Sequence, residues 1–104
     1  MNPSNRDIFM NLIMIERERQ DKKFPNKDKQ KAVTLHQWNT ILTEELGEFA
    51  KEVNDHRDVE ACIELAETAA VCLRIAEVHF GMDVLTQAFV RMAERTSAQK
   101  PAGD

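Results

Sequence analysis

The sequence predicts an all-α protein, a bundle of four helices completed by dimerisation. Glycine and proline, which break helices, occur only three times each in 104 residues. Tyrosine is absent and β-branched residues are few, which disfavours strands. Apolar residues recur at helical spacing along most of the chain. The length suits one domain with a modest core, so we expect a homodimer, or a tetramer of two such dimers, to bury more apolar surface.

The first helix is predicted over residues 5–23. Asn5 or Asp7 is a suitable N-cap, and apolar side chains recur at helical spacing up to Ile15. The charged residues that follow lead to Pro25, which ends the helix.

The second helix is predicted over residues 34–54, after a polar, lysine-rich segment at 26–33 that we interpret as a solvated loop. Thr34 supplies the N-cap. The helix has an apolar face formed by Leu35, Trp38, Ile41, Leu42, Leu46, Phe49, Ala50 and Val53.

The third helix is predicted over residues 58–80, with Asp58 as its N-cap and Gly81 as its C′ residue. Its connection to the second helix is only a few residues long, so the two helices are expected to pack as an antiparallel hairpin. From Val59 onwards this helix is apolar on nearly every side, which predicts burial on several faces.

A fourth helix is predicted over residues 83–96, with Asp83 as its cap. Residues 97–104 read as a flexible tail. No internal repeat is present, so residues 1–96 are expected to form a single helical domain.

The net charge and the length of the apolar runs exclude some classes of partner. A net charge of −4 argues against binding to nucleic acid or to an anionic membrane. The longest apolar run, at residues 69–73, is far shorter than the roughly 20 residues of a membrane span.

Cys62 and Cys72 lie about 15 Å apart on one helix, too far for a disulfide. They predict buried thiols in a reducing cytoplasm.

The segment EELGEFAKE, residues 44–52, departs from an ordinary helix in two ways. Glu45 lies inside the apolar sector, where a carboxylate costs several kcal/mol unless a cation or a hydrogen bond meets it. A solvated acidic face explains Glu44 and Glu52 but not Glu45. Gly47 costs about 1 kcal/mol relative to alanine in a helix, and close approach of another backbone usually offsets that cost.

The second acidic pair lies on the third helix. Glu64 and Glu67 have the same i, i+3 spacing as Glu45 and Glu48, so in an antiparallel hairpin the two pairs face each other. Four converging carboxylates need a cation, because their mutual repulsion would otherwise separate the helices. Hard oxygen ligands select Mg²⁺ or Mn²⁺, and Mg²⁺ commonly recruits phosphate oxygens.

Other metal and nucleotide sites lack their motifs in this sequence. A di-iron bundle needs Glu-x-x-His pairs, and no histidine stands three residues after a glutamate. The cysteines and histidines have no zinc-ligand spacing, and no glycine-rich phosphate loop is present. The acidic residues therefore point to phosphate chemistry with a hard divalent cation.

The pattern Glu44-Glu45-x-x-Glu48, followed by Glu64-x-x-Glu67, resembles the EExxE and ExxD motifs of the MazG-like all-α nucleoside triphosphate pyrophosphatases. The resemblance implies a MazG-like bundle in which Glu45, Glu48, Glu64 and Glu67 hold Mg²⁺. It also implies cleavage of a nucleoside triphosphate, (d)NTP, between the α and β phosphates, giving the monophosphate and pyrophosphate. Glu67 stands where the family pattern has Asp, and its side chain reaches one methylene farther.

The resemblance also suggests roles for residues beside these motifs. Glu44 is a candidate for orienting the attacking water, and an ordinary surface glutamate is the alternative. Lys51 and Arg74 are candidate phosphate contacts, and salt bridges to nearby carboxylates are the alternative. Trp38 is a candidate for stacking on the base, although its place on the apolar face favours the core.

Three other functions stay open from the sequence. The same fold serves hydrolysis of phosphoribosyl-ATP. The Glu67 departure keeps open a catalytically silent helical dimer that binds a nucleotide or a protein partner. A structural role for solvated acids predicts that Mg²⁺ leaves the melting temperature unchanged.

Overall fold

A computed structural model describes residues 2–98, which form five helices and no strand. These are α1 (Asn5–Lys23), α2 (Lys27–Lys31), α3 (Leu35–Asn54), α4 (Asp58–Val78) and α5 (Met82–Ala98). The predicted all-α class is confirmed. Of the predicted tail, residues 97 and 98 belong to α5, and residues 99–104 lie outside the described part of the chain.

The N-terminal caps follow local hydrogen bonding. Ser4, not Asn5, caps α1: its Oγ accepts a hydrogen bond from the Asp7 N–H at 3.1 Å, and Asp7 Oδ2 accepts one from the Ser4 N–H at 3.2 Å. This reciprocal pair is a capping box. Thr34 caps α3 as predicted and forms the same arrangement with Gln37.

The ends of α4 differ from the prediction. Its N-cap is Arg57, and Asp58 is already helical, because the chain reverses at His56 with a left-handed φ of 58°. The helix ends at Val78, two residues earlier than predicted, and Gly81 is not a left-handed C′ residue. The backbone leaves the helix there, and Phe80 packs against the core.

The short helix α2 replaces the predicted loop. Asn26 caps it by accepting a hydrogen bond from the Lys29 N–H at 3.1 Å. Gln30 is buried and donates to the carbonyl of Phe24 at 2.6 Å. Composition alone predicted a loop because this single turn depends on a cap and on one buried glutamine rather than on an apolar face.

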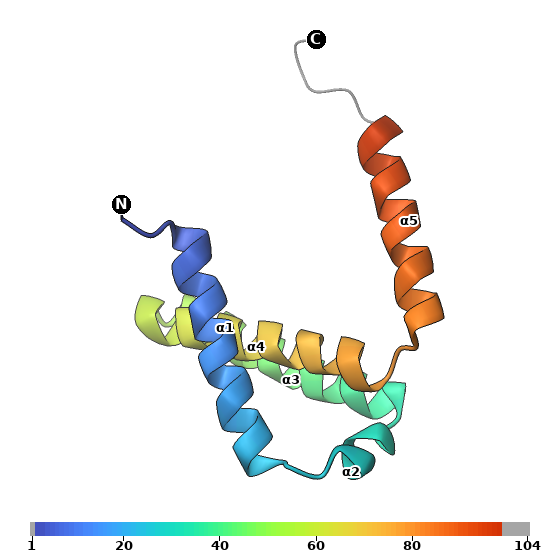
Figure 1. Ribbon diagram of the computed structural model, residues 1–104. Helices are drawn as coiled ribbons and strands as arrows, with labels where there is room; N and C mark the ends of the chain where they lie inside the picture. Colours follow the sequence, from blue (N-terminus) through green and yellow to red (C-terminus); the bar gives the residue numbers. More distant parts are fainter. Residues whose placement is uncertain (1, 99–104) are drawn as a thin grey trace.

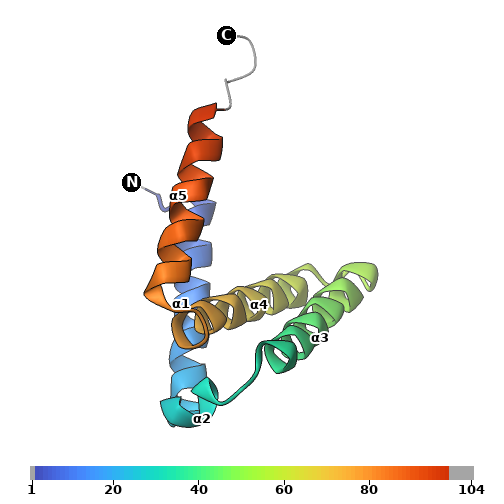
Figure 2. The same ribbon diagram turned by 90° about the vertical axis from the view of Figure 1, so that its right-hand side faces the viewer.

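The centre of the molecule is the α3–α4 hairpin, whose helices lie side by side and antiparallel (Figures 1 and 2). The predicted hairpin is therefore confirmed. Trp38 of α3 packs with Val71 and Ile75 of α4. Partly buried apolar residues surround this core: Val33, Ile41, Leu42, Val78 and Phe80. Four residues predicted on the apolar face are exposed: Leu35, Leu46, Ala50 and Val53.

α1 crosses α4 and contacts it (Figure 1). Its two buried residues are Arg17 and Gln20, while Ile8 and Ile15 are exposed. Arg17 donates two hydrogen bonds to Glu77, at 2.8 and 3.0 Å. Buried polar side chains therefore form part of the attachment of α1, beside the half-buried Phe9, Leu12 and Ile13.

α5 extends away from the hairpin, so the described chain does not close a four-helix bundle by itself (Figures 1 and 2). Residues 82–97 are all exposed. Three apolar residues of α4 that were expected inside are also exposed: Val59, Ile63 and Leu65. The thiols predicted to be buried, Cys62 and Cys72, are on the surface. Among the described helices, none combines the length and apolarity needed to traverse a bilayer.

Gly47 has open space where a side chain would begin. A Cβ built there meets no atom within 4 Å, so the expected close approach of another backbone is absent from the described chain. Gly47→Ala is therefore expected to raise the free energy of unfolding by about 1 kcal/mol, which urea denaturation measures. Ala50→Gly, on the exposed surface of the same helix, is expected to lower it by a similar amount. A loss of stability in Gly47→Ala would instead indicate that a group from outside this chain lies against the glycine.

Candidate metal centre

Four glutamates converge where α3 and α4 face each other. Glu45 and Glu48 come from α3, and Glu64 and Glu67 come from α4. Each offers a carboxylate oxygen, and these oxygens all lie within 4.8 Å of one another. The structure places the four side chains together as the sequence predicted, while their role as metal ligands stays a prediction.

Helix geometry accounts for this convergence. The i, i+3 spacing directs both members of each pair to one side of their helix, and the antiparallel hairpin turns these two sides toward each other. Glu45, Glu64 and Glu67 are consequently half-buried, and only Glu48 is exposed.

The cluster contains acceptors without donors. Glu45 Oε2 and Glu64 Oε2 are buried atoms that receive no hydrogen bond. Burial raises the pKa of Glu64 to about 7, with the negative charges of Glu67 and Glu48 adding to the effect. Burial likewise raises the pKa of Glu45, and the charge of Glu48 is the next cause. The site therefore holds more negative charge than its own surroundings neutralise.

These pKa shifts predict how stability depends on pH without metal. The folded-state pKa of Glu64 lies above its ordinary value of 4.5, so the folded protein binds more protons than the unfolded chain between pH 4.5 and 7. The melting temperature in a chelating buffer should therefore fall as the pH rises through this interval and level off above it. Glu64→Gln should reduce the fall. A melting temperature that instead increased from pH 5 to pH 7 would contradict the raised pKa.

The donor set fits a hard divalent cation. All four groups are carboxylates, the ligands that Mg²⁺ and Mn²⁺ prefer. Ligand oxygens on opposite sides of an octahedral Mg²⁺ lie about 4.2 Å apart, close to the 4.8 Å limit of the cluster. The two unpartnered buried oxygens, on Glu45 and Glu64, give an independent reason to expect a cation.

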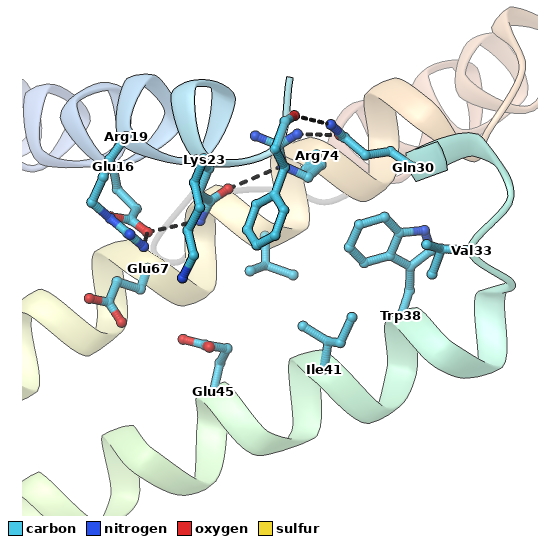
Figure 3. A pocket seen from close by; sticks show the side chains of 13 residues that line it. Glu16, Arg19, Lys23, Gln30, Val33, Trp38, Ile41, Glu45, Glu67 and Arg74 are labelled. Atoms are coloured by element: carbon cyan, nitrogen blue, oxygen red, sulfur yellow. Dashed lines mark hydrogen bonds and ion pairs between the residues drawn. The ribbon is translucent and has the colours of Figure 1, made fainter. Parts of the chain in front are cut away.

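A cavity of ≈ 400 Å³ borders the acidic cluster and shares Glu45 and Glu67 with it (Figure 3). It lies among α1, α3 and α4. Its apolar lining consists of Phe24, Val33, Trp38, Ile41 and Val71. Its polar lining comes mainly from α1 and also includes α2 and α4: Glu16, Arg19, Gln20, Lys23, Gln30 and Arg74.

The contribution of α1 was not predicted from the sequence. Glu16, Arg19 and Lys23 follow one another at i, i+3 and i+7, a spacing that places them on one side of a helix. Figure 3 shows all three reaching from α1 toward Glu45 and Glu67. The spacing was a usable signal for a common face, but nothing in it indicated that this face would meet the acidic pairs.

The substrate residues suggested by the resemblance fall in different places. Trp38 is buried in the core, and it also lines the cavity. Arg74 is buried and forms a salt bridge to Asp21 at 2.7 Å, which is the alternative we considered for it. Lys51 and Glu44 are exposed, and neither lines the cavity nor joins the four-carboxylate cluster.

Comparisons with known proteins add no assignment for this site. No family model, no curated protein and no solved structure matches the chain. Its chemistry is therefore argued from the residues and their geometry.

Proposed function

We propose that the protein is a Mg²⁺-dependent nucleotide pyrophosphohydrolase that cleaves a (d)NTP between the α and β phosphates, releasing the monophosphate and pyrophosphate. The observation that carries this proposal is the four-glutamate cluster at the edge of a cavity that combines apolar and basic lining. The cluster suits a metal bound to phosphates, and the cavity volume falls in the range of small-molecule sites. The resemblance to the MazG-like motifs points to the same reaction.

In this proposal Glu45, Glu48, Glu64 and Glu67 hold Mg²⁺, or Mn²⁺ in its place. The bound cation would neutralise the negative charge that develops on the phosphate oxygens. The longer side chain of Glu67 is compatible with this role, because its carboxylate lies within the same 4.8 Å cluster as the other three. Glu67 therefore keeps a carboxylate in the group despite the departure from the Asp of the family pattern.

The chain's own residues supply the remaining parts. Glu44 stays the candidate for orienting the water that the resemblance suggests, although it is exposed and belongs to neither the cluster nor the cavity lining. Trp38 and Ile41 provide an apolar wall for the nucleoside at the end of the cavity away from Glu67 (Figure 3).

The test is release of pyrophosphate from purified protein. Each ribo- and deoxynucleoside triphosphate, and phosphoribosyl-ATP, is incubated separately with Mg²⁺, with Mn²⁺ or with a chelator. We expect stoichiometric monophosphate and pyrophosphate from at least one nucleotide, only when metal is present. Nucleotide binding without turnover would reject the enzyme and favour the silent binding module.

A second measurement tests the metal without any substrate. Mg²⁺ should raise the melting temperature, because a ligand that binds only the folded state stabilises it. An unchanged melting temperature over millimolar Mg²⁺ would instead support solvated acids without a metal role.

We also propose that the active form is a homodimer. The support is apolar surface on α5, where Leu85, Phe89 and Met92 share one side of an amphipathic helix and Phe89 is 74% exposed. A second copy covering this surface would complete the bundle that one chain leaves open. Sedimentation equilibrium should give twice the mass of the chain, and a monomer at micromolar concentration would reject the proposal.

A further inference from the structure

We infer that Arg19 of α1 binds the polyphosphate of the substrate, and that Glu16 occupies its guanidinium until the substrate arrives. This inference rests on the proposed function, since it names a substrate contact of the same site. It assigns the phosphate contact to α1, not to the acidic hairpin that carries the two recognised motifs.

The geometry of the pair supports this exchange. Arg19 Nε donates to Glu16 Oε1 at 2.6 Å, and a second guanidinium nitrogen donates to Glu16 Oε2 at 2.7 Å. The Arg19 side chain is 56% exposed, whereas that of Glu16 is 11% exposed. Both line the cavity beside Glu45 and Glu67 (Figure 3). The guanidinium is therefore accessible, and its present acceptor is one carboxylate in a two-bond arrangement that a phosphate reproduces.

The position of Arg19 relative to the metal cluster suits a phosphate contact. The hydrogen bond that Arg19 donates to Glu16 is the main reason that the pKa of Arg19 is raised, and the charges of Glu67 and Glu45 add to it. The guanidinium thus lies within electrostatic reach of both acidic pairs. A triphosphate held at these pairs by Mg²⁺ would place further anionic oxygens near Arg19.

Among the three basic residues that line the cavity, Arg19 combines an exposed side chain with a planar guanidinium that can donate two parallel hydrogen bonds to a phosphate. Arg74 already donates to Gln20, Gln30 and Asp21. Lys23 is exposed, with its ammonium 5.4 Å from the centre of the Phe24 ring, but an ammonium lacks the two-pronged geometry of a guanidinium. Arg19 has only Glu16 as its hydrogen-bond partner among the described residues.

Release of Arg19 leaves Glu16 with a partner. Glu16 Oε2 also accepts a hydrogen bond from Gln20 Nε2 at 3.0 Å. When a phosphate replaces the carboxylate as the acceptor for Arg19, Glu16 therefore keeps a donor. Arg19 thus exchanges two charge-assisted hydrogen bonds to Glu16 for two to the phosphate. The half-buried carboxylate of Glu16 keeps its hydrogen bond from Gln20.

The test measures binding rather than turnover. The probes are the α,β-imido analogues of the four deoxynucleoside triphosphates, with Mg²⁺, and the four deoxynucleoside monophosphates. Trp38 is the only tryptophan in the chain and lines the cavity, so its fluorescence reports occupancy, and calorimetry gives an independent Kd. Arg19→Ala should weaken triphosphate-analogue binding by about tenfold or more, and monophosphate binding much less. Arg19→Lys should lie between wild type and alanine.

The matched control is Arg6→Ala, an exposed arginine at the far end of the same helix. It should leave every Kd unchanged, and circular dichroism should show intact helices in all variants. An equal loss for mono- and triphosphates in Arg19→Ala would indicate a general effect on the cavity and would overturn the phosphate assignment.

The role of Glu16 is tested by a double-mutant cycle. Glu16→Gln should tighten triphosphate-analogue binding, because the competing acceptor loses its charge. In the Arg19→Ala background this gain should shrink. An equal gain in both backgrounds would show that Glu16 acts only through its charge, and the proposed exchange would then be wrong.

These measurements separate the inference from the proposed function. Pyrophosphate release with an Arg19→Ala variant of unchanged KM and Kd would overturn the inference and leave the enzyme. Binding that depends on Arg19 without any pyrophosphate release would overturn the enzyme and leave the phosphate site.

Discussion

Glu64→Gln is expected to lower Mg²⁺-dependent pyrophosphate release by about 100-fold or more. Changes in the outer shell of metal sites commonly cost 10–100-fold, and this substitution changes a proposed direct ligand. An amide keeps the shape of the side chain but loses the charge that the cation requires. Glu60→Gln is the matched control, because Glu60 lies one turn earlier on α4 and forms only a surface pair with Arg57 at 3.4 Å. It should retain full activity.

The same substitution should have the opposite effect on the metal-free protein. Because the pKa of Glu64 is raised to about 7, its charged form is disfavoured in the folded state at pH 8. Glu64→Gln should therefore raise the melting temperature in a chelating buffer and abolish the further rise that Mg²⁺ produces in wild type. Scanning calorimetry of both proteins, with and without Mg²⁺, measures this. A variant that was less stable without metal but still stabilised by Mg²⁺ would remove Glu64 from the ligand set.

Arg74→Leu is expected to lower the free energy of unfolding by about 2–4 kcal/mol, since it leaves buried polar groups without their partner. Arg74 is 6% exposed and belongs to α4. It donates to Gln20 of α1 at 3.2 Å, to Gln30 of α2, and to Asp21 of α1 at 2.7 Å. One side chain thus joins three helices, and leucine has the bulk but none of the donors. Urea denaturation followed by circular dichroism measures the loss.

The control for Arg74 is an arginine whose own side chain is 54% exposed. Arg57 pairs with Glu52 and Glu60 at the start of α4, at 3.3 and 3.4 Å. Arg57→Leu should cost less than about 1 kcal/mol, because water and salt screen such pairs. If Arg74→Leu instead left stability unchanged and weakened triphosphate binding, Arg74 would be a phosphate contact, as the sequence first suggested, and not a structural residue.

The acidic site was predictable because every step toward it is local. The i, i+3 spacing of Glu45 with Glu48, and of Glu64 with Glu67, fixes which way each pair points on its helix. The short connection between the helices then requires an antiparallel hairpin. The spacing within each pair and the short turn between the helices are enough to bring the four carboxylates together. The rest of the chain need not be known.

The sequence by itself thus determined the helical class, most helix boundaries and the four-glutamate cluster. Only the tertiary structure decided that α1 contacts α4 through Arg17 and Gln20, that Arg74 is buried in this contact, and that Arg19 faces the acidic pairs. It also decided that α5 is exposed and that Gly47 faces open space. The physical reason is that periodicity shows which residues share a face of a helix. Which surface that face contacts depends on packing between segments far apart in the chain. In the contact between α1 and α4, buried polar side chains take a part that the sequence pattern did not predict.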